Sequence, residues 1–520
     1  MENEIASSQK ETKQKIPDAI DHLFDALDIE ANGAIKKTDL FQALARHGIL
    51  EDDARIKETI QSLDKLGDSK ISPEAFRKSV GQNITLIEKA MTGQLIIPDF
   101  NNFNSFITNI YNRTILNTDG NVSDHIPELS ADPEQYAVSI CTIDGQRLNI
   151  GPYTAALIAR SVCTPINYCI ALDELGEEET HKHVGRAPKE KGFHYLMLNN
   201  DGLPHNPLDA SGALMVSSLV KLELEPAKKF NAILDTWAAM AGGIRPGLNK
   251  GAILSEKGVS DAEYTLAYFM RQNGLFAKGT DINEILNLYF SCLSIETTTE
   301  ALSVIASTLA NAGICPKTGE KVLKPETVKN CLSLMYSCGM EQYSSEFAFS
   351  VGLPAKSGIS GVIVIVVPNV MGIAIWSPRI NDHGISVRGL DFCRKFIQRF
   401  NFHNYDSLIK TPEKINPRLT KNEIRMKGIM ALVEAASRGD LFEVQRLAST
   451  GIDLNEGDYD NRTPIHLAAS EGHINVVEFF ISKNVDVNPK DRWGGTPLAD
   501  ARRGGYEKII ALLEKHNARD

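Results

Sequence analysis

The chain lacks an apolar run long enough to span a membrane. Its most apolar stretch, residues 361–376, is shorter than the ~20 residues that a transmembrane helix requires, and a Pro-Asn pair at 368–369 interrupts it. The β-branched segments on either side of this pair, Val362–Val367 and residues 370–376, are typical of a hairpin of two buried strands. We therefore expect no membrane partner and assign the stretch to a protein core.

Paired cysteines are also missing. The eight cysteines include no Cys-x-x-Cys pair, which is the spacing that zinc sites and redox dithiols use. Isolated cysteines in a long chain indicate reduced, packed thiols rather than a disulfide framework, and this favours an intracellular compartment. The cysteines stand at positions 141, 163, 169, 292, 315, 331, 338 and 393.

Basic residues are fewer than acidic residues in this chain. The chain has 55 Lys and Arg against 66 Asp and Glu, so its net charge is −11, and this argues against nucleic acid as a partner. The first twenty residues have neither the apolar core of a secretory signal nor the arginine content of a mitochondrial presequence. We predict a cytoplasmic location, with mitochondria as the alternative.

The length of 520 residues, with 42% apolar and 23% charged residues, allows two to four domains. We predict a helical, EF-hand-like region at 1–105, a catalytic-type domain at 106–408, a polar linker at 409–425 and helical repeats at 426–520.

Two polar loops in the first region have the spacing of paired EF-hands. The loop at residues 28–39 has Gly33 at the sixth position, where the calcium loop turns sharply, and a short Asp at the twelfth. The second loop, residues 64–71, has Leu66 at a ligand position. Calcium binding at the first loop and a purely structural helix pair both stay open. The candidate ligands are Asp28, Glu30, Asn32 and Asp39.

The last region repeats with a period of 33 residues. Gly439, Gly472 and Gly505 follow this period, as do Thr463-Pro-Ile-His-Leu-Ala468 and Thr496-Pro-Leu-Ala-Asp-Ala501. This pattern predicts all-α ankyrin repeats, in which each helix pair buries its apolar face against its neighbours. We expect protein partners to bind here; capping of the preceding domain is the alternative.

Five motifs in the middle of the chain carry a family resemblance. They are Cys141-Thr-Ile-Asp-Gly-Gln-Arg147, Pro204-His-Asn-Pro207, Leu353-Pro-Ala-Lys-Ser-Gly358, Pro368-Asn-Val-Met-Gly372 and Phe402-His-Asn-Tyr-Asp406. In this order and at these spacings, the chain resembles the kidney- and liver-type glutaminases of animals nearly end to end.

The resemblance implies a multidomain protein whose central domain is α+β and β-lactamase-like, with an antiparallel sheet and a helical cluster. It implies hydrolysis of L-glutamine to L-glutamate and ammonia with no metal or organic cofactor. It also implies a homotetramer, in which a loop at residues 192–199 lies at an interface beside the active site.

The resemblance places the nucleophile at Ser161, but the motif around this serine is incomplete. In Ser-x-x-Lys enzymes a lysine one helical turn later accepts the hydroxyl proton, and Thr164 stands there instead. A threonine hydroxyl cannot act as that base. A second family lysine falls on Asn167, and no lysine occurs between Ser161 and Lys182.

Two tyrosines of the family's proton relay are replaced as well. His125 stands before Ile-Pro, and Glu341 follows Cys-Gly-Met, with Tyr343 nearby as a substitute. A neutral imidazole accepts a proton near pH 7, so His125 is a candidate base; a packed or surface histidine is the alternative. Ile359 falls where the family's backbone amide stabilises the oxyanion, and a backbone group tolerates side-chain exchange.

Substrate-binding positions are partly retained. Glu256 and Tyr289 match family residues, whereas two family asparagines fall on Ala210 and Glu263. With the changes at positions 164 and 341, the pocket is about three charges more negative than the family's if its glutamates are ionised. Such a pocket repels the carboxylate of glutamine, unless the glutamates point into solvent or pair with cations. We take Lys356 as the only lysine near it.

We therefore predict a glutaminase homologue with weak or no activity. The alternatives are an active glutaminase with a rewired base, a non-catalytic regulatory subunit that forms a hetero-oligomer with active glutaminase, and a binder of L-glutamine or another small amino-acid-like ligand. An amidohydrolase for a more cationic amide is a further possibility.

Overall fold

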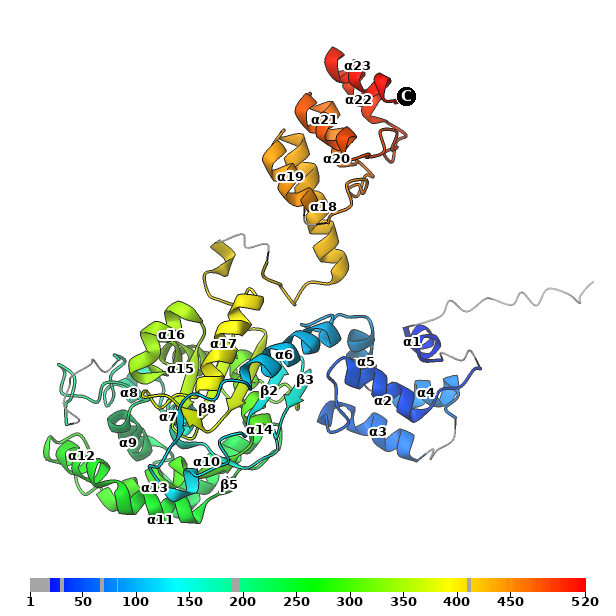
Figure 1. Cartoon of the computed structure of the whole chain (residues 1–520). Helices are drawn as coiled ribbons and strands as arrows, with labels where there is room; N and C mark the ends of the chain where they lie inside the picture. The colour runs from blue at the N-terminus through cyan, green and yellow to red at the C-terminus, as the bar shows by residue number, and fades with distance from the viewer. Residues whose placement is uncertain are drawn as a thin grey trace, which may run out of the picture. The chain divides into compact units, whose positions relative to one another are not determined.

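The computed structural model describes residues 19–28, 32–65, 70–81, 83–188, 196–408, 413–449 and 451–520. The chain divides into two compact units, residues 1–418 and 419–520. The first unit holds an EF-hand-like helical region and a sheet domain, and the second holds helical repeats (Figure 1). The three expected fold classes are thus confirmed.

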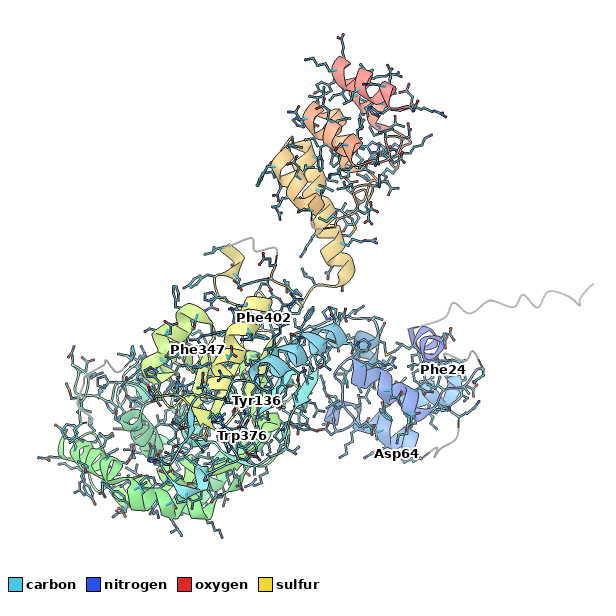
Figure 2. The ribbon with its side chains drawn as sticks, in the orientation of Figure 1. Phe24, Asp64, Tyr136, Phe347, Trp376 and Phe402 are labelled. Atoms are coloured by element: carbon cyan, nitrogen blue, oxygen red, sulfur yellow. The ribbon has the colours of Figure 1, made fainter. Side chains whose placement is uncertain are left out.

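The EF-hand-like region packs its helices around one apolar core. Phe24 and Phe76 meet edge to face in this core, with ring centroids 5.7 Å apart, and Figure 2 labels Phe24. A two-way backbone bridge between Ile35 and Ile71 joins the two loops. The helices are α1 (Ala19–Leu27), α2 (Lys37–Arg46), α3 (Lys57–Asp64, after η1 Ala54–Ile56), α4 (Pro73–Val80) and α5 (Ile84–Met91).

The motif at residues 141–147 joins this region to the sheet domain. The amide of Gln146 donates to the carbonyls of His47 and Ile97, both at 3.0 Å. The guanidinium of Arg147, almost fully buried, donates to the Asp52 carboxylate at 2.7 Å. This part of the family motif therefore holds the EF-hand-like region against the sheet domain.

The main sheet has five antiparallel strands in the order β3-β2-β9-β8-β7. The predicted hairpin is present as β8 and β9, and Val370 belongs to its turn instead of the second strand. The strands are β2 (Ala137–Thr142), β3 (Arg147–Ile150), β7 (Ala355–Gly358), β8 (Val362–Val367) and β9 (Met371–Trp376).

Both faces of this sheet are covered by helices, which explains the unbroken apolar runs of its strands. In β8, residues 362, 364 and 366 face one core, and residues 363, 365 and 367 face the other. Helix α14 (Thr299–Ala310) packs on the first face, and α6 (Phe100–Thr114) and α17 (Val387–Arg399) lie side by side on the second (Figure 1). Gly372 lets α14 approach closely, since a Cβ there would lie 2.2 Å from the Ser307 nitrogen.

Most of the remaining helices surround the first core, whereas Phe347 of α16 packs in the second. Two small antiparallel sheets, β4-β6-β5 and β1-β10, complete the domain. Figure 2 labels the side chains of Tyr136 and Trp376, which belong to the same domain. The other helices are α7 (Cys163–Leu175), α8 (Glu177–His181), α9 (Ala210–Leu219), α10 (Pro226–Met240), α11 (Lys250–Val259), α12 (Asp261–Gln272), α13 (Ile282–Leu293), α15 (Pro325–Cys338) and α16 (Ser344–Ser350).

Short segments complete the list of elements. They are β1 (Asn121–Val122), β4 (Leu157–Ile158), β5 (Gly247–Leu248), β6 (Ile295–Thr297), β10 (Arg379–Ile380), η2 (Pro127–Leu129), η3 (Arg160–Val162), η4 (Glu341–Tyr343) and η5 (Asp406–Leu408). All eight cysteines are buried and free, as the sequence predicted. Among the described helices, none combines the length and apolar character that crossing a membrane would require.

In the second unit, the glycines of the 33-residue period close the helical turns. Gly439, Gly472 and Gly505 adopt φ of +69°, +83° and +72°, a left-handed conformation that favours glycine. The Thr463 hydroxyl and the His466 ring lie 2.9 Å apart and close the first Thr-Pro turn. The helices are α18 (Lys421–Ser437), α19 (Leu441–Ser449), α20 (Pro464–Ser470), α21 (Ile474–Ser482), α22 (Pro497–Gly504) and α23 (Glu507–Lys515).

Candidate active site

Ser161 lies on a tight turn between a strand and a helix. It is the middle residue of η3, which leads directly into α7, and it is half-buried. The preceding Arg160 has φ of +51°, a left-handed conformation that non-glycine residues adopt rarely and that clusters at functional sites. Strand β7 runs beside this turn, since a Cβ on Gly358 would lie 3.4 Å from the Ala159 carbonyl oxygen.

Thr164 points back to the backbone. Its hydroxyl donates to the Ser161 carbonyl oxygen at 3.0 Å, and the residue is 5% exposed. This is the usual bond of a threonine to its own helical turn. The Thr164 hydroxyl is therefore bonded to the backbone of Ser161, and a threonine side chain holds no basic group.

Arg160 forms a buried ion pair with Glu256, and the sequence interpretation missed it. The guanidinium contacts the Glu256 carboxylate, and the two side chains are 8% and 2% exposed. The left-handed turn at Arg160 places this cation beside Ser161. The carboxylate charge of Glu256 is therefore balanced by an arginine, a cation that the sequence analysis did not include beside Lys356.

His125 lies on the other side of Glu256. Its Nε2 is 3.5 Å from a Glu256 oxygen, and its side chain is 37% exposed. Burial, followed by the charge of Arg160, lowers the pKa of His125 from its usual value. The imidazole is thus neutral at pH 7 and can accept a proton. Ile126, the next residue, packs in a small apolar cluster with Ile158, Ala252 and Ile359.

Two further predicted residues belong to the same neighbourhood. Glu263, half-buried in the first turn of α12, acts electrostatically on both His125 and Arg160. Tyr289, in α13, is 7% exposed and also acts on Arg160. The helices α11, α12 and α13 thereby gather Glu256, Glu263 and Tyr289 around the Arg160 guanidinium.

Lys356 lies on β7 in complete burial. Its Nζ donates to the Ser357 carbonyl at 3.0 Å and lies 3.8 Å from a Glu341 oxygen. Burial lowers the pKa of Lys356, and the Glu341 carboxylate acts in the opposite direction. Its charge also affects Cys163, two residues after Ser161. A second candidate base, besides His125, therefore lies on the strand that runs beside the Ser161 turn and is far away in sequence.

Glu341 is mostly exposed and sits in a left-handed turn. Its side chain is 59% exposed and its φ is +52°. The turn begins at Gly339, where a Cβ would lie 1.8 Å from the Ala355 carbonyl, so only glycine fits against β7. Tyr343, the suggested substitute for the family tyrosine, has its hydroxyl 2.5 Å from an Arg394 nitrogen.

Ala210 and Ile359 both lie at the end of a secondary-structure element. Ala210 opens α9 directly after the cap Asp209, whose carboxylate accepts from the Gly212 amide at 2.8 Å. The charges of Asp209 and Lys356 both affect the pKa of the Cys338 thiol. Ile359 follows β7 at the end that borders Ala159 and Arg160. The predicted residues of the site thus come from η3, η4, β7, the loops next to η2 and β7, and five helices, α7, α9, α11, α12 and α13.

The calcium candidates bind backbone groups. Asp28 accepts from the Gly33 amide at 2.7 Å, and Asp39 accepts from the Lys36 amide at 3.0 Å as part of the α2 cap. The Asn32 side chain accepts from the Ala34 amide at 3.1 Å. Within the described ranges, no three His, Cys, Asp or Glu residues cluster as a metal site would. Glu30 and residues 192–195, the first half of the predicted interface loop, lie outside the described residues.

Comparison with known proteins agrees with this arrangement. The glutaminase family model matches residues 120–405, an EF-hand domain model matches residues 19–98, and a model of three ankyrin repeats matches residues 403–491 and 432–520. The chain is 41% identical over 433 residues to the Mus musculus protein called glutaminase liver isoform, mitochondrial, covering 82% of this chain and 72% of that protein.

More distant relatives share the central domain. The chain is 33% identical over 292 residues to a glutaminase of Nostoc sp., covering 56% of this chain and 86% of that protein. The crystal structure of Mglu in its native form matches with a TM-score of 0.55 and 28% identity, covering 58% of this chain and 72% of that one. The family model spans more than half of the residues, and the chain therefore belongs to the glutaminase family.

Proposed function

We propose that this glutaminase-family protein hydrolyses L-glutamine weakly or not at all. The observation that carries this proposal is the buried ion pair between Arg160 and Glu256. Glu256 is the carboxylate that the family resemblance assigns to substrate binding. A ligand ammonium group must displace Arg160 to reach it, and breaking a buried, desolvated pair is unfavourable by several kcal/mol.

Proton transfer is impaired independently of binding. Thr164 stands where the family has its base, and its hydroxyl is bonded to the Ser161 carbonyl. Loss of a positioned general base slows a reaction by about 10²–10⁴-fold. In the family reaction, Ser161 would attack the side-chain amide, release ammonia and form an acyl-enzyme that water cleaves to glutamate. The Ile359 amide would stabilise the oxyanion.

A second candidate is an active glutaminase with a rewired base. Two observations favour it: the lowered pKa of His125 beside Glu256, and the lowered pKa of the fully buried Lys356 on β7. Because its pKa is lowered, each of these two groups would lose its proton at a lower pH than the same type of side chain exposed to water. His125 is the base that the sequence suggests, and Lys356 is the one that the fold adds.

Assembly and location are part of the proposal. We infer a homotetramer or a hetero-oligomer with active glutaminase subunits, in which a chain of low activity acts as a regulatory subunit. The ankyrin repeats support binding of further proteins. The mouse relative is called mitochondrial, which supports a mitochondrial location over the cytoplasmic one. Glutamine or a similar small amino acid is the proposed ligand.

A glutamate-release assay on the purified full chain, run beside Ser161→Ala, tests the proposal. We expect a rate far below the roughly 1–10³ s⁻¹ of ordinary enzymes. We also expect glutamine at millimolar concentration to leave the melting temperature unchanged, because a ligand stabilises only when its concentration approaches Kd. An ordinary rate that Ser161→Ala abolishes would establish the rewired enzyme instead.

A further inference from the structure

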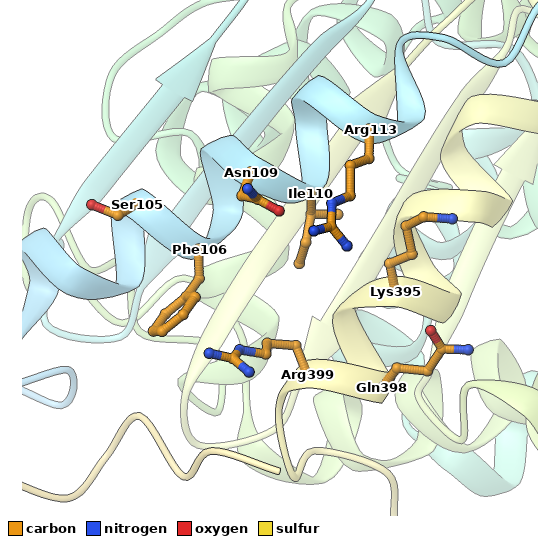
Figure 3. Close-up of a pocket in the computed structure, with 8 residues that line it drawn as sticks. All are labelled: Ser105, Phe106, Asn109, Ile110, Arg113, Lys395, Gln398 and Arg399. Atoms are coloured by element: carbon orange, nitrogen blue, oxygen red, sulfur yellow. The ribbon is translucent and has the colours of Figure 1, made fainter. Parts of the chain in front are cut away.

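A cavity of about 570 Å³ lies between α6 and α17. These helices cover the face of the main sheet opposite α7 and α14, so the cavity is separate from the site around Ser161. Its volume is within the range of small-molecule sites, which is roughly 300–1,000 Å³. Figure 3 shows the side chains that line it, contributed by both helices.

The charged side chains described at this cavity are all cationic. Three cationic side chains line it, Arg113, Lys395 and Arg399, and no carboxylate is among the described residues that do so. Lys395 is neutralised by Asp391 at 2.5 Å, one turn earlier on α17. Arg113 and Arg399 form no ion pair with any residue that the structure describes. Two guanidinium charges thus remain without a carboxylate partner at the same cavity.

Arg399 is partly withdrawn from water. Its guanidinium carbon lies 4.1 Å from the centre of the Phe106 ring, and its Nε is buried without a hydrogen-bond partner among the described atoms. A desolvated, unpartnered donor is unfavourable unless an acceptor reaches it. In Figure 3 the guanidinium of Arg113 extends from α6 into the gap between the helices, and that of Arg399 extends beneath Phe106.

The same cavity has an apolar part. Phe106 is half-buried and Ile110 is 6% exposed, and both line the cavity on α6 with the amide side chain of Asn109 beside them. Guanidinium groups bind phosphate or carboxylate oxygens by paired, charge-assisted hydrogen bonds. The cavity therefore combines recognition of an anion with a surface for a small apolar or aromatic body.

We propose that the cavity between α6 and α17 binds a small organic anion, a phosphate monoester or a free carboxylate with an aromatic or apolar body. The anionic group contacts Arg113 and Arg399, and the body packs on Phe106 and Ile110. This site is independent of glutamine turnover, because it lies across the sheet from Ser161.

Calorimetric titration of the full chain with phenyl phosphate, inorganic phosphate and phenol tests the site. Phenyl phosphate should bind saturably, inorganic phosphate more weakly, and phenol not measurably. Arg113→Gln and Arg399→Gln should each weaken phenyl phosphate binding by about tenfold or more, since each removes charge-assisted hydrogen bonds. Added salt should weaken it as well. Phe106→Leu should reduce the difference in affinity between phenyl phosphate and inorganic phosphate.

Arg271→Gln is the matched control, because Arg271 also stacks on an aromatic ring, Tyr268 at 4.6 Å, but outside the cavity. It should bind phenyl phosphate like the wild type. Arg113 is exposed, so its variant tests the site even if Arg399→Gln alters folding. Absence of saturable phenyl phosphate binding by the wild type, or cavity variants that bind phenyl phosphate as tightly as the wild type, would overturn the proposal. A changed oligomeric state of these variants in light scattering, without anion binding, would identify the cavity as a protein interface.

Discussion

The Nζ of Lys356 lies 3.8 Å from the carboxylate of Glu341, although Lys356 is fully buried and Glu341 is mostly exposed. The pair joins β7 to the left-handed turn that begins at Gly339. The carboxylate raises the pKa of Lys356, but burial is the larger effect and the net shift is downward. Protonation of Lys356 therefore affects both its availability as a base and the stability of the fold.

Lys356 should make stability depend on pH. Its pKa in the folded chain is below the value of 10.5 for an exposed lysine, so the unfolded chain binds more protons between these two values. Stability then rises as pH increases through that window. Lys356→Met should flatten this slope in urea unfolding curves measured from neutral pH to pH 10. Lys257→Met, on the exposed side of α11, is the control, and an unchanged slope in Lys356→Met would contradict the assignment.

Arg160→Gln should release Glu256 for a ligand. Removing the guanidinium frees the carboxylate that the resemblance assigns to substrate, so glutamine should begin to raise the melting temperature. Adding Ala210→Asn, Glu263→Asn and Glu341→Tyr to Arg160→Gln should enlarge this glutamine-dependent shift without restoring turnover, because Thr164 still supplies no base. A saturable shift in the wild-type chain would show that Arg160 does not block the site.

Thr164→Lys alone should restore little glutamate release. The lysine would supply a base one turn after Ser161, but Arg160 and the changed substrate positions still oppose binding. Initial rates of the single variant, compared with the same change added to Arg160→Gln, separate the two defects. Substantial recovery in the single variant would mean that the substrate pocket is otherwise intact.

Asp52→Asn should weaken the attachment of the EF-hand-like region. Arg147 and Lys317 hold the pKa of Asp52 well below its usual 3.8. For a carboxylate with a lowered folded pKa, the stabilisation is full above 3.8 and is lost as pH falls through the folded value. The wild-type melting temperature should therefore fall more steeply than that of the variant below pH 4. Because the Asp52 side chain is 56% exposed, the difference should be small and should shrink with added salt. Parallel acid profiles would argue against this pair as a docking contact.

Gly472→Ala should destabilise the repeats more than Gly505→Ala. Both glycines have positive φ, which is unfavourable by about 1–2 kcal/mol for other residues. A Cβ at Gly472 would also lie 2.5 Å from the Tyr506 ring, whereas nothing lies within 4 Å of one at Gly505. Hydrogen exchange across α20–α23 in the full chain should show the larger loss of protection in Gly472→Ala. The opposite order would indicate that Tyr506 moves aside freely.

The sequence predicted the elements that depend on local pattern. The apolar run at residues 361–376 could only be a buried hairpin, since it is too short for a membrane and its turn carries Pro368 and Asn369. The 33-residue period predicted the repeats, because Gly439, Gly472 and Gly505 share the left-handed turns that such a period requires. The Ser-x-x-Lys resemblance likewise implied a helical turn after Ser161, and α7 begins two residues later, at Cys163.

Contacts between distant segments were decided by the tertiary structure alone. The pair of Arg160 with Glu256 depends on a left-handed turn that no residue pattern indicates, and it balances the charge of that carboxylate. The lowered pKa of Lys356 arises from burial on an inner strand, and the cavity between α6 and α17 arises from the packing of helices that lie far apart in the chain. Sequence spacing determines which side chains share an element, whereas burial, charge pairing and cavities depend on which elements meet.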